Sequence, residues 1–471
     1  MVTSICLLTC ALTVAQPPSR SEWQLSPQLL AGMELKYTGT YVEEELDPNV
    51  RYQRRYRLET TLFVLESAPR RWDVAFMTSL SLREQTRDNS ILSKDRPTSV
   101  RLELATLDAQ GKLHGATPLA IPVSGPPTLE CGMVVEAPIT KVGRDQFWEV
   151  NEPGRPPRTW QVAGAESCDG FTCIKVVGNQ QSDDWDRPRA DHTAWRRRDT
   201  VWLKPKLWVA QKVERVIERR APARRDPTQR TTVRYELASS PKYPGRLLDD
   251  RRQEILKAKK FQDDAQPLLA QPGQYRPQIE AMLRKLALYL DSQAPTPYRE
   301  AVLAIQRHLE GARRGDSPPA ITPEEEAVKA TVAIGQRVPD FLVTDLTGKD
   351  TVRLARLLGR PVFIFFYKPA TDTSKEVLRF AQALHQKHGD KLSIMAMAVG
   401  VEPDAARKHQ AELKLPFAVL DGSGLHQTFA VDATPRLIVL DGEGILRFAT
   451  TGWGIQTPRE ITEELVRTMA K

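Results

Sequence analysis

The sequence predicts a multidomain α+β protein, and three observations support this prediction. Residues 22–245 carry partly alternating runs rich in Tyr, Thr, Val and Leu between turn residues, which is typical of an antiparallel β-rich domain. Residues 246–314 carry apolar side chains at helical spacing, which predicts a helical connector. Residues 331–471 alternate strand and helix patterns, which predicts a C-terminal α/β domain with a mainly parallel sheet. The Pro- and Glu-rich stretch 315–330 is the predicted linker before this domain.

The N-terminal stretch predicts export. Residues 1–15 hold an apolar run that is too short to cross a bilayer and ends in small residues, so we expect a signal peptide and an extracytoplasmic location such as the periplasm. No positive charge precedes this run, and an upstream start codon would explain that gap. Cys10 ends a faint lipoprotein-like motif, but Thr9 fits poorly before it, which argues against a lipid anchor at Cys10.

The β-rich region is expected to form one curved sheet or an open barrel, because its strands are long and have one polar face. Residues 199–214 faintly resemble a strand pair in LolA-like carriers of lipoproteins or lipids. This resemblance implies an apolar ligand for the β-rich domain and, as one functional hypothesis, a carrier.

Two cysteines of the β-rich region, Cys168 and Cys173, lie on either side of an Asp-Gly turn. In an exported protein this spacing favours a structural disulfide that clamps a hairpin. The alternative is a redox-active pair, which would need a thiol of low pKa beside a helix N-terminus or a fixed positive charge. Cys131 is then expected to be a buried free thiol. The chain has no CxxC motif and its histidines are scattered, so we predict neither a metal site nor a cofactor.

Charge and composition limit the classes of partner. With 41% apolar and 27% charged residues, the chain has the composition of a globular protein and not of a disordered or membrane-spanning one. The net charge is +8, and residues 191–235 alone carry thirteen Lys/Arg against five Asp/Glu. Such a stretch either attracts an anionic partner or forms a solvated strand face, and the mixed signs favour the strand face. Nucleic acid is the least favoured partner for an exported protein.

The C-terminal region contains a strand-to-helix junction. The continuous apolar run 362–367 predicts a strand buried on both faces. A helix is expected over 373–389, with Thr371 or Thr373 as its N-cap and a stop at Gly389. The run 436–452 predicts a β-hairpin, since an Asp-Gly-Glu-Gly turn divides it.

Three segments of this region carry a family resemblance. The stretches 335–348 (GQRVPDFLVTDLTG), 354–362 (LARLLGRPV) and 433–444 (ATPRLIVLDGEG) resemble redoxin domains of the AhpC/TSA and TlpA/ResA type. The resemblance implies a thioredoxin fold over residues 331–471. It also implies a cis-proline at Thr434-Pro435, beside a groove that receives an extended peptide. The spacing from Pro435 to the hairpin turn is similar to the thioredoxin/TlpA side of the superfamily, and not to peroxiredoxins.

The same resemblance places Thr371 and Ser374 on the two cysteine positions of the family pattern. A hydroxyl supplies neither a thiolate nor a disulfide, so no catalytic residue is expected at this junction. His385 and His388, the nearest histidines in sequence, are about three helical turns away and cannot activate Ser374.

We therefore predict an exported, redox-inactive binding or scaffold protein with a protein or peptide partner. One alternative is a thiol-disulfide oxidoreductase or antioxidant that uses cysteines from elsewhere in the chain. The other is the lipid or lipoprotein carrier. The sequence leaves the oligomeric state open.

Overall fold

The structure is a computed structural model of the chain. It describes the following residues: 22–82, 97–115, 132–151, 155–187, 193–222, 224–270, 275–292, 296, 298–314, 332–346, 350–369, 371–399, 403–429, 431 and 433–469. The predicted signal peptide, Cys10, Cys131 and the whole predicted linker 315–330 lie outside these residues. Within them, no helix combines the length and the apolar character that a membrane span requires.

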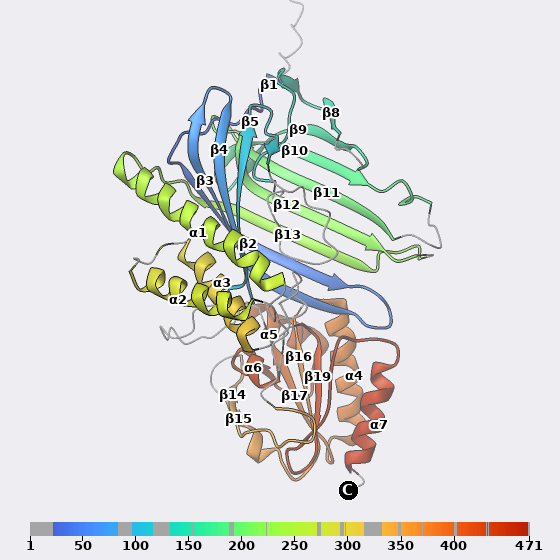
Figure 1. Ribbon diagram of the computed structural model, residues 1–471. Helices are drawn as coiled ribbons and strands as arrows, with labels where there is room; N and C mark the ends of the chain where they lie inside the picture. Colours follow the sequence, from blue (N-terminus) through green and yellow to red (C-terminus); the bar gives the residue numbers. More distant parts are fainter. Residues whose placement is uncertain are drawn as a thin grey trace, which may run out of the picture.

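The N-terminal half forms one antiparallel sheet of eleven strands in the order β6-β5-β4-β3-β2-β13-β12-β11-β10-β9-β8. The strands are β2 (Glu34–Glu45), β3 (Tyr52–Ala68), β4 (Arg71–Leu82), β5 (Pro97–Asp108), β6 (Leu113–His114), β8 (Phe147–Val150), β9 (Arg158–Cys168), β10 (Phe171–Gln181), β11 (Ala194–Lys204), β12 (Val209–Arg220) and β13 (Gln229–Ser239). Strands β1 (Glu22–Trp23) and β7 (Val142–Gly143) pair separately. Because β6 and β8 are its two edges, the sheet is open, which confirms the predicted antiparallel β-rich region (Figure 1).

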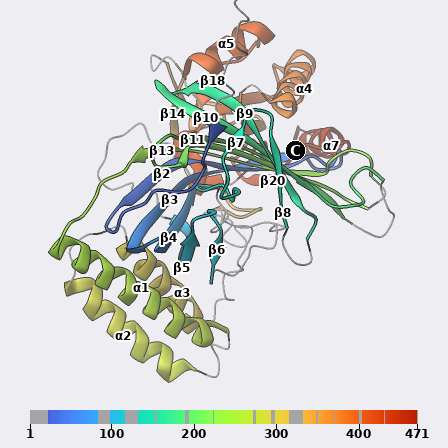
Figure 2. The same cartoon turned by 90° about the horizontal axis from the view of Figure 1, so that it is seen from above.

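Both faces of this sheet carry apolar side chains, because strand side chains alternate between the faces. One face holds the largest core cluster, which includes the buried tyrosines Tyr37, Tyr41, Tyr56 and Tyr235. The other face of β3, β4 and β5 is covered by three helices, as the view from above shows (Figure 2). These helices are α1 (Arg246–Ala270), α2 (Arg276–Ser292) and α3 (Arg299–Arg314).

The helical region therefore shares a core with the sheet and does not act as a free spacer. The apolar stripe Ile279, Met282, Leu283, Leu286 and Leu290 of α2 is buried in that core. The helices were predictable because apolar residues recur in the sequence at helical spacing. Their packing partner was not predictable from it, because an apolar stripe does not specify which surface will cover it.

The C-terminal domain has a five-stranded sheet in the order β18-β17-β16-β19-β20 and a small hairpin of β14 and β15. Its strands are β14 (Leu342–Thr344), β15 (Thr351–Arg353), β16 (Val362–Tyr367), β17 (Ser393–Ala398), β18 (Val419–Asp421), β19 (Arg436–Leu440) and β20 (Leu446–Thr451). Its helices are α4 (Asp372–His388), α5 (Pro403–Leu413), α6 (His426–Phe429) and α7 (Thr457–Met469), with short 3-10 turns η2 (Leu354–Arg356) and η3 (Ser423–Leu425). This is a thioredoxin-like fold.

The sheet of this domain is mixed, which corrects the expectation of a mainly parallel one. Strands β16, β17 and β18 are parallel, whereas β19 and β20 form the predicted antiparallel hairpin. Every residue of β16 is buried, because α4 and α7 pack on one face and the segments around β14, η2 and α6 pack on the other. The burial explains why the sequence 362–367 is apolar at every position.

Candidate functional site

The strand-to-helix junction lies at one end of the C-terminal sheet. Phe366 near the end of β16 pairs with Arg436 at the start of β19, so the junction after β16 lies beside the residues that precede β19. The peptide bond between Thr434 and Pro435 is cis. The tertiary structure therefore brings both predicted site segments, 371–374 and 434–435, to the same end of the sheet.

Thr371 and Ser374 form a helix cap at this junction. Thr371 is the N-cap of α4, which selects one of the two predicted alternatives, and its Oγ1 accepts the Ser374 N–H at 3.2 Å. The same hydroxyl donates to Ser374 Oγ at 2.7 Å, with the Lys368 carbonyl oxygen at 3.3 Å as a second acceptor. Ser374 is only 1% exposed. Both hydroxyls are thus engaged with each other and with the backbone.

The hydrogen bonds of this pair, among the described residues, do not include a side-chain base. His385 and His388 lie in the last turn of α4, at the opposite end of the helix. The neighbouring Asp372 is exposed and pairs with Lys375 at 3.2 Å. A serine without an adjacent base is a poor nucleophile, so the arrangement favours capping over chemistry.

The edge beside cis-Pro435 is occupied by another part of the chain. The N–H of Gln53 donates to the Thr434 carbonyl oxygen at 2.8 Å, and the Thr434 N–H donates to the Gln53 carbonyl oxygen at 2.8 Å. Arg51 and Trp453 exchange a second pair of backbone hydrogen bonds at 3.0 and 2.8 Å. Residues 51–53 directly follow the turn of the β2–β3 hairpin. They therefore pair with the C-terminal domain as a short antiparallel strand.

A charged side-chain contact accompanies this backbone pairing. Arg51 Nη1 and Nη2 donate to the two carboxylate oxygens of Glu376 on α4, at 2.9 and 2.5 Å. Trp453 Nε1 donates to the same carboxylate at 3.1 Å. The Arg51 hydrogen bonds lower the pKa of Glu376, and the Trp453 hydrogen bond acts in the same direction. Such bidentate guanidinium–carboxylate pairs have a defined geometry.

Lys368 also lies at this junction between the two halves of the molecule. Burial lowers its pKa to about 8, and the positive charge of Arg55 from β3 acts in the same direction. The carboxylate of Glu44 on β2 opposes this shift without cancelling it.

Sequence reasoning missed the residues of this contact, Arg51, Glu376 and Trp453. Arg51 and Glu376 are separated by 325 positions, and no local pattern marks either of them. Only the three-dimensional position of the hairpin reveals that they belong together.

Cys168 and Cys173 are recorded as free, buried cysteines, so the predicted disulfide is not formed in this structure. Cys168 pairs with Phe171 and Cys173 with Glu166, which makes the two cysteines diagonal neighbours and not directly opposed ones. Diagonal residues are about 7–8 Å apart, slightly beyond the range of a relaxed disulfide. The disulfide remains a prediction that would need a small local adjustment.

The electrostatic surroundings of these thiols disfavour reactivity. Burial raises the pKa of Cys168 to about 12, and the Asp169 carboxylate adds to the effect. Burial also raises the pKa of Cys173. The two thiols pack against Trp202. A thiolate, which is the nucleophile in disulfide exchange, is therefore scarce at neutral pH.

The cysteine pair is also far from cis-Pro435. Gln53, which pairs with Thr434, is connected across the sheet to Gln181 of β10 by a row of paired residues. This row crosses five strand spacings, or about 24 Å along the sheet. Cys173 lies eight residues from Gln181 along β10, which adds a displacement of about 26 Å in the strand direction. Direct exchange between these thiols and the Pro435 edge would need a large rearrangement.

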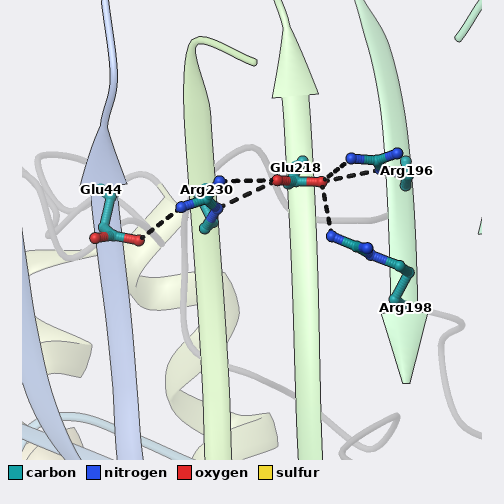
Figure 3. Close-up of polar contacts among 5 residues, drawn as sticks. All are labelled: Glu44, Arg196, Arg198, Glu218 and Arg230. Carbon is teal, nitrogen blue, oxygen red and sulfur yellow. Dashed lines mark hydrogen bonds and ion pairs between the residues drawn. The ribbon is translucent and has the colours of Figure 1, made fainter. Parts of the chain in front are cut away.

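The basic stretch 191–235 is divided between the two faces of the sheet. On one face, Glu218 of β12 accepts hydrogen bonds from Arg196 at 2.6 and 2.9 Å and from Arg230 at 3.1 and 3.2 Å, while Arg198 lies at 3.4 Å (Figure 3). Arg230 is also within 3.9 Å of Glu44. Burial would raise the pKa of Glu218, but the hydrogen bonds from its arginines outweigh burial and lower it.

On the other face, Asp199 is 1% exposed and accepts hydrogen bonds from Arg197 at 2.7 Å and Arg215 at 2.5 Å. Several arginines of the stretch are thus neutralised within the sheet, in agreement with its mixed charge pattern. Among the residues that the structure describes, no group of three or more His, Cys, Asp or Glu side chains is arranged to hold a metal ion.

Comparisons with known proteins concern the C-terminal domain. Residues 334–449 match the AhpC/TSA family. The thiol-disulfide oxidoreductase ResA of Bacillus cereus is 30% identical over 122 residues, which cover 25% of this chain and 69% of that protein. ResA of Bacillus anthracis is 31% identical over 122 residues, with the same coverage.

Two solved structures are similar to the same part of the chain. A thiol:disulfide interchange protein DsbE from Chlorobium tepidum has 18% identity and a TM-score of 0.28, covering 30% of this chain and 99% of that one. The exposed lipoprotein thioredoxin Etrx1 of Streptococcus pneumoniae has 23% identity and a TM-score of 0.25, covering 27% of this chain and 99% of that one. On the sequence match to its ResA relatives and on the family match over residues 334–449, the chain belongs to the AhpC/TSA family through its C-terminal domain.

Proposed function

We propose that this chain is an exported protein whose thioredoxin-like domain is redox-inactive and acts as a binding or scaffold module. The observation that carries the proposal is the cap at the start of α4, where the hydroxyls of Thr371 and Ser374 bond to each other and to the backbone. Neither residue has the thiol that disulfide exchange requires.

The contacts at the Pro435 edge support the scaffold role. The backbone of Thr434 and Trp453 holds residues 51–53, and therefore the long β2–β3 hairpin, against the C-terminal domain. Pairing through backbone groups does not use cysteine, so this role is compatible with the loss of redox chemistry.

A disulfide-reductase assay on the full chain tests the proposal. The wild-type protein and the Cys168→Ser/Cys173→Ser variant are both expected to react at the background rate. The Thr371→Cys/Ser374→Cys variant is the matched positive control, because it places two thiols three residues apart at a helix N-terminus, where a thiol pKa is lowered. A wild-type rate well above background that persists in Cys168→Ser/Cys173→Ser would refute the proposal.

The second candidate function is that of a thiol-disulfide oxidoreductase, and the printed names of the ResA relatives favour it. In this chain, Cys168 and Cys173 are the described cysteines that would have to supply the thiols. A reductase rate that disappears in Cys168→Ser/Cys173→Ser, together with native-state reaction of the pair with a dithiol reagent, would support it. The raised pKa values of both thiols count against that outcome.

Two further parts of the proposal rest on the sequence. Export rests on the apolar run within residues 1–15, and N-terminal sequencing of the protein from a periplasmic fraction tests it. The carrier hypothesis rests on the faint LolA-like resemblance of residues 199–214. Lipid that copurifies with the protein after gentle extraction would support a carrier function, and its absence would count against one.

A further inference from the structure

We infer that the edge beside cis-Pro435 is a specific recognition site for an extended segment with an arginine two residues before the residue that pairs with Thr434. We further infer that its occupant is the chain's own segment 51–53, which closes the site to other peptides. The acid that selects the arginine is Glu376. The inference concerns binding only and does not depend on whether the domain has lost redox chemistry.

The first support is the backbone pairing of residues 51–53. Tyr52 pairs with Glu45 of β2, so the backbone groups of Arg51 and Gln53 point to the side away from β2. These groups bond to Trp453 and Thr434, respectively. An extended segment that adds to a strand edge in this way gains affinity from the backbone and specificity from its side chains.

The second support is the fit of the arginine. Glu376 receives both terminal nitrogens of Arg51 and is itself oriented by Trp453 Nε1. Lysine cannot reproduce this two-pronged contact, because its ammonium group is a single point of charge. The site therefore distinguishes arginine from other residues at this position of the segment.

The third support is the close approach of the two backbones. A Cβ atom at Gly454 would lie 1.6 Å from the Asn49 carbonyl oxygen, so the turn of the hairpin packs directly on the glycine backbone. Gly452 has φ +93, and a Cβ there would lie 3.1 Å from a Val50 side-chain carbon. Both glycines leave the space that the hairpin turn fills.

The occupant and an external peptide would use the same backbone groups of Thr434 and Trp453. They would also use the same carboxylate of Glu376. An external segment can therefore bind only to molecules in which the hairpin has left the site. Its apparent affinity is its intrinsic affinity multiplied by the fraction of molecules in which the site is open.

Peptide binding to the full-length protein tests the inference. The probe is a fluorescently labelled peptide of residues 47–55 (DPNVRYQRR), and the readout is fluorescence anisotropy. The Arg51→Ala/Gln53→Pro variant is designed to release the hairpin, since proline removes the N–H that donates to Thr434. This N–H points away from β2, so the β2–β3 ladder keeps its own hydrogen bonds. Circular dichroism and the thermal unfolding midpoint confirm that the variant is folded.

The released variant is expected to bind the probe roughly tenfold or more tightly than the wild-type protein. A second peptide with alanine in place of the arginine at position 51 is expected to bind the released variant roughly two- to fivefold more weakly than the probe does, because it lacks the partly exposed bidentate contact. Adding Glu376→Ala to the released variant should abolish the difference between the two peptides. Equal binding of the probe by the wild-type and released proteins, or equal binding of both peptides by the released variant, would overturn the inference.

A cross-link provides a second measurement, in which a disulfide holds the hairpin in the site until it is reduced. Gln53 and Thr434 exchange both backbone hydrogen bonds, and residues paired in this way have Cα atoms about 5.5 Å apart, within disulfide range. The Gln53→Cys/Thr434→Cys variant is expected to form a disulfide between these positions, and the added Arg51→Ala change should let the probe bind only after reduction. Failure of the two cysteines to cross-link, or equal probe binding before and after reduction, would count against the inference.

Discussion

The cap at Thr371 and Ser374 and the edge at Thr434 and Pro435 lie at the same end of one sheet, yet they differ in what they can still do. At the cap, function in a redox domain depends on side-chain sulfur, and here hydroxyls stabilise the helix. At the edge, recognition depends mainly on backbone groups, and these groups are bonded to residues 51–53. Under the proposed function, hydroxyls at the two positions of the cap remove redox chemistry, whereas backbone pairing at the edge does not depend on those two side chains.

The two halves of the molecule meet at the Pro435 edge. The hairpin that enters the edge belongs to the eleven-stranded sheet, whose remaining strands lie away from the C-terminal domain (Figure 1). A domain of the AhpC/TSA family is thus in contact with the large sheet, and among the described residues the two have separate core clusters.

The largest effect is expected from Gly454→Ala at the edge. The new methyl group would overlap the Asn49 backbone, which cannot yield as a flexible side chain would. We expect the hairpin to lose its docking and the free energy of unfolding to fall by about 2–3 kcal/mol. Hydrogen exchange at the Thr434 and Trp453 amides should become faster. Gly424→Ala is the matched control, because no atom lies within 4 Å of its added Cβ. Unchanged exchange in Gly454→Ala would contradict the assigned contact.

At the cap, Thr371→Ala is expected to lower the free energy of unfolding by about 1 kcal/mol, because the Ser374 N–H loses its side-chain acceptor. Disulfide-reductase activity should not change from its background value. Thr371→Ser is the control, since it keeps the capping oxygen. Chemical denaturation of the three proteins measures the effect, and a loss of catalytic activity in Thr371→Ala would assign chemistry to the cap.

A smaller effect is expected from Glu376→Gln, about 0.5 kcal/mol at pH 7, because the pair with Arg51 is partly exposed. Arg51 lowers the pKa of Glu376 in the folded protein. The stabilisation is therefore present above the ordinary carboxyl pKa of about 4.3 and is lost as the pH falls through the lowered value. Unfolding free energies of the wild-type and Glu376→Gln proteins should converge at acid pH. Two parallel curves between pH 7 and pH 3 would show that the pair does not contribute.

An effect that depends on pH is expected at Lys368, where burial lowers the pKa to about 8. Between about pH 8 and the ordinary lysine value of about 10.4, the unfolded chain holds a proton that the folded protein has released, so stability rises with pH. Lys368→Met should be more stable than the wild-type protein at pH 7 and should lack that rise. Denaturation at pH 7, 8.5 and 10 measures it, with the exposed Lys391→Met as control. A wild-type rise that persists in Lys368→Met would locate its origin elsewhere.

Several elements were predictable because their signals are local. The apolar run 362–367, the capping residues before α4 and the turn residues between β19 and β20 each specify structure through contacts a few residues apart. The family motifs extended these local predictions to the fold of the C-terminal domain. The mixture of parallel and antiparallel strands in its sheet was harder to predict, because the direction of a strand depends on the path of the connection before it.

The candidate site was predictable only in part. Thr371, Ser374, Thr434 and Pro435 were found because motifs mark their positions. Arg51, Glu376 and Trp453 were not, since an arginine in a hairpin and a glutamate on a helix are common surface residues. The diagonal position of Cys168 and Cys173 also depends on hairpin register, which the spacing of four intervening residues did not specify.

The sequence by itself determined the secondary structure of the C-terminal domain, its family and the absence of cysteine at the junction, because these follow from local patterns and residue identities. Only the tertiary structure decided that the three helices cover one face of β3, β4 and β5 and that the β2–β3 hairpin occupies the Pro435 edge. Such contacts join residues that are hundreds of positions apart in the sequence. They use backbone groups that every residue carries, so no side-chain pattern predicts them.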